Sequence, residues 1–141
     1  MLARVLEELR RERDRLQAAV ESSLDALFLC EALKDEQGDI EDFIFTYLNR
    51  NVEDLVKIPR NELLGGRMCK LLPVNLSTHL FEAYKQAAIT GVPFLTEIQI
   101  EPEPEESGWL RIQAVRLDEG VAITASDMSK QKALRSRLKA R

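Results

Sequence analysis

The chain has 141 residues, 45% of them apolar and 31% charged, which suits one ordinary globular domain better than two. The net charge of −4 hides an uneven distribution, because residues 25–127 carry 9 basic and 19 acidic side chains whereas residues 128–141 carry six basic ones and no acid. An acidic body excludes extensive nucleic-acid binding, since affinity for phosphates comes from basic side chains.

The cysteines and the hydropathy pattern set further limits. Cys30 and Cys69 lack metal-ligand spacing, so neither a zinc site nor a disulfide framework is expected. No apolar run reaches the roughly 20 residues that a membrane span needs, and the N-terminus is charged from Arg4 onward. We therefore expect a cytoplasmic location, reduced thiols, and no membrane span or signal peptide within this stretch.

Residues 1–24 predict an amphipathic helix. Its apolar residues recur at spacings of four and three, as in the a/d seam of a coiled coil, and one arginine in the seam would fix the register. The seam consists of Leu2, Leu6, Leu9, Arg13, Leu16 and Val20. Such a stripe needs a partner, so we expect a homodimer through this helix and a sheet edge. The alternative is a helix folded back on its own domain.

Residues 25–127 predict one α+β body. The segments ALFLCEAL and EDFIFTYL flank KDEQGDI and indicate a β-hairpin over residues 26–48. VPFLTEIQI and GWLRIQAVRL alternate apolar and polar residues with period two, EPEPEESG joins them, and GVAITAS supplies a last strand. Five strands with a helical insert after the second predict an antiparallel sheet.

Helical patterns fill the insert and follow the last strand. Short helices with Asn51 and Asn61 as caps are expected first, then one helix over NLSTHLFEAYKQAAITG that begins near Asn75 or Ser77 and ends at Gly91. Residues 128–141 predict the start of a polar helix with a narrow apolar seam. Because strand passes into helix without a loop, we expect the chain to be cut from a longer protein.

Five motifs in this order resemble a PAS domain, the sensory module of many bacterial signalling proteins, over about residues 22–130. YLNRN resembles the family's Tyr-Val-Asn-Pro segment, IPRNELLGGR its Ser-Arg-Glu-Glu-Leu-Leu-Gly-Arg turn, ITGVPF its Thr-Gly-Glu-Pro segment, and GWLRIQAVRL its Gly-Arg-Trp-Leu-Arg-Val strand. Asp127-Met128-Ser129 resembles the Asp-Ile-Thr motif between the last strand and the exit helix. The resemblance implies a PAS fold, with a five-stranded antiparallel sheet, helices between strands 2 and 3, and signalling helices at both ends.

The resemblance also implies a function. It predicts a non-enzymatic sensory module that dimerises and relays a signal through its flanking helices to a C-terminal output domain, such as a diguanylate cyclase or a histidine kinase. Asp127, Met128 and Ser129 are the expected relay junction, because Asp127 can accept hydrogen bonds from the start of the helix. A lone histidine and the lack of a phosphate-binding loop argue against catalysis. A purely structural oligomerisation module is a further alternative.

Two residues raise the question of a cofactor. GRMCKLL resembles the stretch of the flavin-binding LOV domains that carries a photoreactive cysteine, at the position of Cys69, and His79 lies in the helix from which haem-binding relatives offer a ligand. Met68 and Pro73 depart from the flavin pattern, and the third and fourth strands contain no asparagine. We predict no cofactor and no metal, with a flavin or haem sensor as the alternative. Cys69 is then a small buried hydrophobe and His79 a surface residue.

In PAS-like folds a ligand sits between the concave face of the sheet and the long helix. Residues expected to line such a hollow are Leu29, Phe45, Tyr47, Leu80, Tyr84, Ile98, Ile112 and Ile123. Nearly all are aliphatic or aromatic, which favours a small apolar ligand. A filled core without a ligand is equally compatible with these residues.

Overall fold

Period-two alternation of apolar and polar residues produces the strands of the body. The computed structural model describes residues 1–100 and 108–139, so most of the predicted EPEPEESG connection lies outside the described residues. In chain order the elements are α1 (Leu2–Glu21), β1 (Ala26–Lys34), β2 (Ile40–Leu48), α2 (Arg50–Val56), α3 (Arg60–Leu63), α4 (Met68–Leu71), α5 (Val74–Ser77), α6 (Leu80–Thr90), β3 (Phe94–Gln99), β4 (Trp109–Leu117), β5 (Gly120–Asp127) and α7 (Ser129–Lys139).

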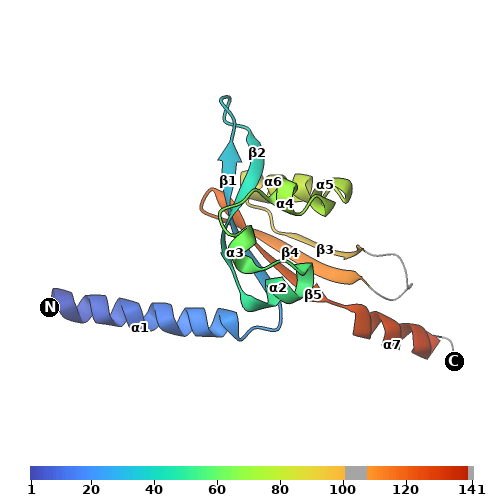
Figure 1. The fold of residues 1–141 in the computed structure, drawn as a ribbon, viewed down its shortest axis with the longest axis horizontal. Helices are drawn as coiled ribbons and strands as arrows, with labels where there is room; N and C mark the ends of the chain where they lie inside the picture. Colours follow the sequence, from blue (N-terminus) through green and yellow to red (C-terminus); the bar gives the residue numbers. More distant parts are fainter. Residues whose placement is uncertain (101–107, 140–141) are drawn as a thin grey trace.

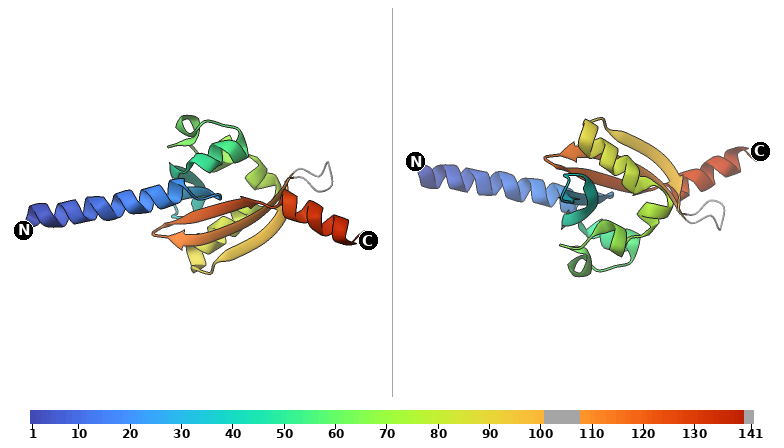
Figure 2. Two further views of the ribbon diagram at one scale, coloured as in Figure 1. Left: turned by 90° about the horizontal axis from the view of Figure 1, so that it is seen from below. Right: turned by 90° about the horizontal axis from the view of Figure 1, so that it is seen from above.

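The five strands form one antiparallel sheet, as the sequence predicts, and their order in it is β2-β1-β5-β4-β3. The first and last strands are neighbours, and Ala26 at the start of β1 pairs with Ala125 near the end of β5. The chain therefore enters and leaves the sheet at the same end. From there α1 and α7 extend in opposite directions (Figures 1 and 2).

The hydrophobic core lies between one face of the sheet and helices α2 to α6. Every second residue of β1 from Ala26 to Cys30 is buried, and so is every second residue of β5 from Val121 to Ala125. The ring of Phe43 in β2 packs edge-on against Phe81 of α6, with 5.8 Å between the ring centroids. The alternation of the strands thus decides which side chains face the helices.

Two predicted lining residues lie on the other face of the sheet, and a β-bulge in β2 accounts for one of them. Cys30 pairs with Phe45 and Leu29 pairs with Tyr47, so Thr46 has no partner in the ladder. An extra residue of this kind reverses the alternation beyond it. Phe45 therefore faces the core, whereas Tyr47, predicted to line the hollow, faces the other side of the sheet. Leu29, also predicted to line it, faces that side too, because it lies between the inward-facing Phe28 and Cys30 of β1.

The helix predicted over residues 75–90 is two helices. α5 ends at Ser77 and α6 begins at Leu80, because His79 between them has a φ of 63°, in the left-handed region. The hydroxyl of Thr78 donates to the carbonyl of Val74 at 2.6 Å and closes the last turn of α5. Gly91, with a φ of 75°, ends α6 as predicted.

The predicted caps of the short helices are also displaced. Asn51 and Asn61 lie inside α2 and α3, and the residues that precede these helices are Asn49 and Pro59. Asn51 uses its side-chain amide for contacts outside its own helix. The two asparagines thus correctly indicated that α2 and α3 exist, but they did not locate the residue at which each helix begins.

A buried carboxylate joins the edge strand β2 to the segment that carries Cys69. Asp42 is 4% exposed, and its Oδ1 accepts the backbone N–H of Phe43 at 2.8 Å and that of Cys69 at 3.1 Å. Nε of Arg67 lies 3.4 Å from Oδ2 of Asp42, and Nη2 of Arg67 lies 2.8 Å from Glu41. One aspartate thus satisfies two backbone donors and orients α4 against the sheet.

We expect Asp42→Ala to destabilise the chain by about 2–4 kcal/mol, because two backbone N–H groups lose their acceptor and Arg67 loses an ion pair. Asp42→Asn keeps the acceptor and should cost less than half as much. Urea unfolding followed by circular dichroism measures both variants, with Glu41→Ala as the exposed control. Equal stability of Asp42→Ala and Glu41→Ala would contradict the assignment.

Candidate functional site

The predicted relay residues meet at the step from strand to helix. β5 runs to Asp127 and α7 begins at Ser129, with Met128 between them. The backbone N–H of Met128 donates to the carbonyl of Trp109 at 2.8 Å, and Oδ1 of Asp127 accepts the N–H of Ser129 at 2.9 Å. We call these three residues the exit junction. The start of α7 is therefore hydrogen-bonded both to β4 and to the side chain of Asp127.

Lys132 adds a contact that the sequence did not suggest. Its Nζ lies 4.6 Å from the centre of the Trp109 ring and 3.2 Å from Oε1 of Glu97. The lysine side chain is only 20% exposed. A cation held between an aromatic face and a carboxylate fixes which side of α7 faces the sheet. The direction of α7 is thus set by β3 and β4 together.

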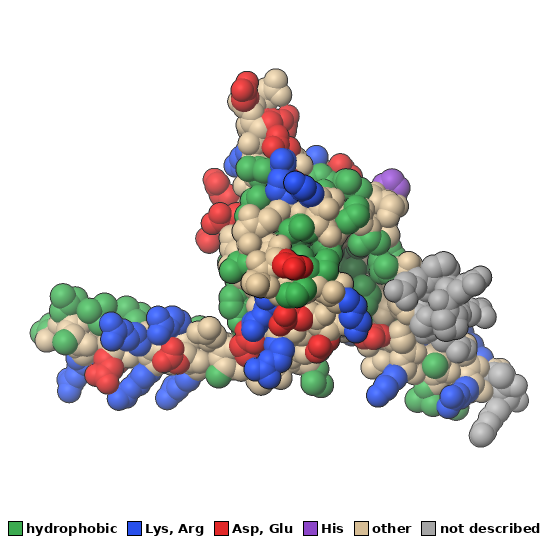
Figure 3. Space-filling view, viewed as in Figure 1, with side chains coloured by type: hydrophobic (Ala, Val, Ile, Leu, Met, Phe, Trp, Pro, Cys, Tyr) green, Lys and Arg blue, Asp and Glu red, His purple; other side chains and the backbone are tan. Residues whose placement is uncertain are grey.

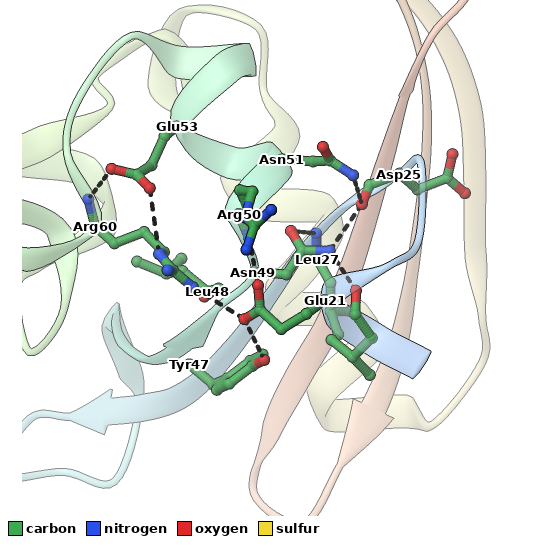
Figure 4. Close-up of polar contacts among 11 residues, drawn as sticks. Glu21, Asp25, Leu27, Tyr47, Leu48, Asn49, Arg50, Asn51, Glu53 and Arg60 are labelled. Atoms are coloured by element: carbon green, nitrogen blue, oxygen red, sulfur yellow. Dashed lines mark hydrogen bonds and ion pairs between the residues drawn. The ribbon is translucent and has the colours of Figure 1, made fainter. Parts of the chain in front are cut away.

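A polar cluster around Glu21 lies where α1 joins the start of β1 (Figure 4). The hydroxyl of Tyr47 donates to Oε1 of Glu21 at 2.8 Å, and Nη1 of Arg60 donates to the same oxygen at 2.9 Å. The backbone N–H of Arg50 donates to Oε2 at 3.2 Å. The hydrogen bond from Tyr47, followed by the contacts with Arg50 and Arg60, lowers the pKa of the Glu21 carboxyl against the opposing effect of burial.

Asn49 completes this cluster from inside the fold. Its side chain is fully buried, and its Nδ2 donates to the carbonyls of Val20 at 3.0 Å and Asp25 at 2.9 Å. Its Oδ1 accepts the N–H of Leu27 at 3.0 Å. We call Glu21, Tyr47, Asn49 and Arg60 the entrance clamp. Sequence reasoning missed the clamp, although Tyr47 and Asn49 lie in the YLNRN motif that carries the family resemblance.

Helix α1 projects from the body, and none of its residues is buried (Figures 1 and 2). The alternative in which it folds back on its own domain is therefore wrong. Figure 3 shows hydrophobic side chains along one side of α1. Leu2, Leu6, Leu9 and Leu16 of the predicted seam are exposed, Arg13 pairs with Asp14 at 3.1 Å, and Val20 is half-buried at the base. Pairing of two such helices stays a prediction.

A cavity of about 810 Å³ lies between the inner face of the sheet and the helices. Its lining includes five of the predicted residues, namely Phe45, Leu80, Tyr84, Ile112 and Ile123. Ile98 packs against the core without lining the cavity. Tyr47 faces away from the cavity because of the bulge in β2, and Leu29 because of the alternation of β1. What occupies the cavity stays a prediction.

The wall of the cavity is mainly apolar, and several polar residues also line it. Phe28, Met68 and Leu110 join the apolar wall. The half-buried Asn51 and the exposed Asp54 and Lys57 form a polar rim, and the buried Asn75 adds one more polar side chain. The wall also reaches Leu24, in the linker after α1, and Asp127 and Ser129, in the exit junction. The cavity is thus in contact with both points at which a flanking helix joins the body.

The two residues considered for a cofactor lie outside this cavity. Cys69 is half-buried at α4, and the exposed His79 precedes α6, and neither lines the cavity. Burial raises the pKa of both thiols, Cys30 and Cys69, to about 12, and the charge of Asp42 acts in the same direction. Within residues 1–100 and 108–139, no three His, Cys, Asp or Glu side chains gather as a metal site would require, and no helix is long and apolar enough to cross a membrane.

A thiol with a raised pKa stays protonated at neutral pH, and thiolate is the reactive form. We therefore expect both cysteines of the folded chain to react with a disulfide reagent at about pH 8 at least tenfold more slowly than in the unfolded chain. The rate should rise with pH well above the range of an ordinary cysteine. Stopped-flow thiol titration, with the urea-unfolded chain as control, measures this. If one of the two thiols reacts rapidly in the folded chain, the more exposed Cys69 is accessible and the expected protection is absent.

No family model matches the sequence, and comparison with curated proteins finds no match either. Solved structures do match. A domain of a sensory box sensor histidine kinase/response regulator from Geobacter sulfurreducens superposes with a TM-score of 0.61 at 18% identity, over 84% of this chain and 96% of that one. A sensory box sensor histidine kinase from Vibrio cholerae gives 0.55 at 13% identity, over 90% and 98%. The PAS domain of a Colwellia psychrerythraea protein gives 0.54 at 19% identity, over 86% and 98%.

These matches agree with the architecture described above. The chain has the PAS fold, an antiparallel sheet of five strands with helices inserted between β2 and β3 and a helix at each end. The fold predicted from the motif order is confirmed. Structural matches at identities below 20% establish only the fold, so the function of this chain has to be argued from its own cavity and junctions.

Proposed function

We propose that the chain is the sensory input domain of a cytoplasmic bacterial signalling protein and has no catalytic activity of its own. The observation that carries the proposal is the cavity wall, which contains core residues of the sheet together with Asp127 and Ser129 of the exit junction. A change in the occupancy of the cavity therefore acts directly on the start of α7. The output unit in the parent protein is a histidine kinase or a diguanylate cyclase, and two of the structural neighbours are sensor histidine kinases.

The relay is a change in the direction of α7. Met128 is hydrogen-bonded to Trp109, and Lys132 contacts the ring of the same tryptophan, so a shift of β4 moves the base of the helix. Packed junctions of this kind move between discrete arrangements rather than deforming gradually. A displacement of less than one ångström at the sheet is thereby converted into a reorientation of α7.

The ligand is a small molecule with an apolar body and a polar end. Aromatic and aliphatic side chains form most of the cavity wall, whereas Asn51, Asp54 and Lys57 form its polar rim. A cavity of about 810 Å³ is within the range of small-molecule sites. Because Cys69 and His79 lie outside it, we propose neither flavin nor haem as the occupant.

We expect Asp127→Ala to uncouple output from input in the intact protein while the body stays folded. Removal of the carboxylate takes away the acceptor of the Ser129 N–H and costs about 0.5–2 kcal/mol of helix stability. Asp127→Asn keeps an acceptor and should restore the response. Hydrogen exchange of α7 together with the output activity measures both effects. Full signalling by Asp127→Ala would refute the relay role of this junction.

The chain is proposed to act as a homodimer through α1 and a sheet edge. A 20-residue helix with an exposed apolar stripe is marginal in water unless the stripe is covered. Native mass spectrometry should show two chains per particle and report any retained ligand. The sample should be colourless, since a visible spectrum would favour the flavin or haem alternative.

The matched control for the dimer is deletion of residues 1–20. This variant should give a monomer with the same retained ligand, because the cavity contains no residue of α1. A dimer that survives the deletion would show that α1 does not carry the pairing. A monomeric full-length chain at micromolar concentration would contradict the proposal outright.

A further inference from the structure

Helix α1 touches the body only at its base. All residues from Met1 to Ala19 are exposed, and contact begins at Val20 and Glu21. A helix of 20 residues is about 30 Å long, so a tilt of about 10° at the base displaces its far end by about 5 Å. The direction of the whole helix is therefore decided by the few groups that hold its last turn and the linker after it.

Those groups belong to three different elements. Tyr47 comes from the end of β2, Asn49 precedes α2, and Arg60 begins α3. The guanidinium of Arg60 also contacts the carbonyl of Leu48 at 3.2 Å and a carboxylate oxygen of Glu53 in α2 at 3.3 Å. Figure 4 shows the side chains of Tyr47 and Arg60 meeting at Glu21, with Asn49 beside them. The position of the Glu21 carboxylate therefore depends on how β2, α2 and α3 are placed relative to one another.

The clamp adjoins the cavity through Asn51. Nδ2 of Asn51 donates to the carbonyls of Ser23 and Asp25 in the linker, and Asn51 is itself part of the cavity wall. Leu24 of the same linker also lines the cavity. An occupant that accepts a hydrogen bond from this amide removes a donor from the linker carbonyls. The linker then loses one of the contacts that fix the base of α1.

We infer that Glu21 is a positioning residue for a second relay, in which the entrance clamp converts changes at the rim of the cavity into a change in the direction of α1. The inference rests on the proposed sensory function for its biological use, but its geometry stands apart from the exit junction. Each exposed ion pair in such a cluster is weak on its own. The buried amide of Asn49 holds the linker, while Tyr47 and Arg60 hold the carboxylate, so the parts act as one network.

The test measures the direction of α1 in the full chain. Spin labels at Arg4→Cys and Gln86→Cys, in a background with Cys30→Ala and Cys69→Ala, report the distance from the far end of α1 to the exposed side of α6. Dilution with unlabelled chain restricts the signal to labels within one molecule. The variants are Glu21→Gln and Tyr47→Phe in the entrance clamp and Asn51→Ala beside it, and we refer to the three together as the clamp variants. Matched controls are Glu12→Gln, on the exposed part of α1, and Asn61→Ala, outside the cavity wall.

We expect the clamp variants to shift or broaden the distance distribution by about 5 Å, whereas the controls leave it as in the parent chain. Cooperative thermal unfolding of each variant confirms that the body is intact, and Tyr47→Phe, which removes one hydroxyl, guards against a general loss of fold. Distributions unchanged in all three clamp variants would overturn the inference. This outcome leaves the exit junction untouched, because Asp127→Ala is read through α7 and the output activity.

Discussion

The buried side-chain amide of Asn49 holds together the point at which helix, linker and sheet meet. It binds a carbonyl at the end of α1, a carbonyl of the linker and the N–H of Leu27 in β1. Each of these groups would cost about 1–3 kcal/mol if it were left unpaired inside the protein. The position of this one amide therefore fixes where β1 starts relative to the end of β2. The clamp on α1 and the rim of the cavity both depend on that placement.

The local sequence pattern was sufficient to predict the five strands, but not their order in the sheet. Strand β4 was expected over residues 108–117 and runs from Trp109 to Leu117, since each side chain of an alternating segment has a clear preference for core or solvent. The same reasoning failed at Thr46, because nothing in the local pattern marks which residue lacks a partner in the ladder. It failed again at His79, whose left-handed backbone divides a segment of good helical pattern.

The candidate site was predictable only in part, and for a physical reason. Asp127, Met128 and Ser129 are adjacent in the chain, so a local motif was enough to place them at one junction. Glu21 and Arg60 are 39 residues apart, and their contact depends on how β2, α2 and α3 are folded against one another. Lys132 meets Trp109 and Glu97 for the same reason. Contacts of that kind become visible only when the fold is known.

The adjacency of β1 and β5 has a further consequence. Ala26 and Ala125 sit on neighbouring strands, about 4.8 Å apart in the direction of pairing, so the body begins and finishes at nearly one place. A module of this shape can be spliced into a helical rod as a side branch, without forcing the two halves of the rod apart. A change that weakens the pairing of β1 with β5 would then alter the directions of both flanking helices at once.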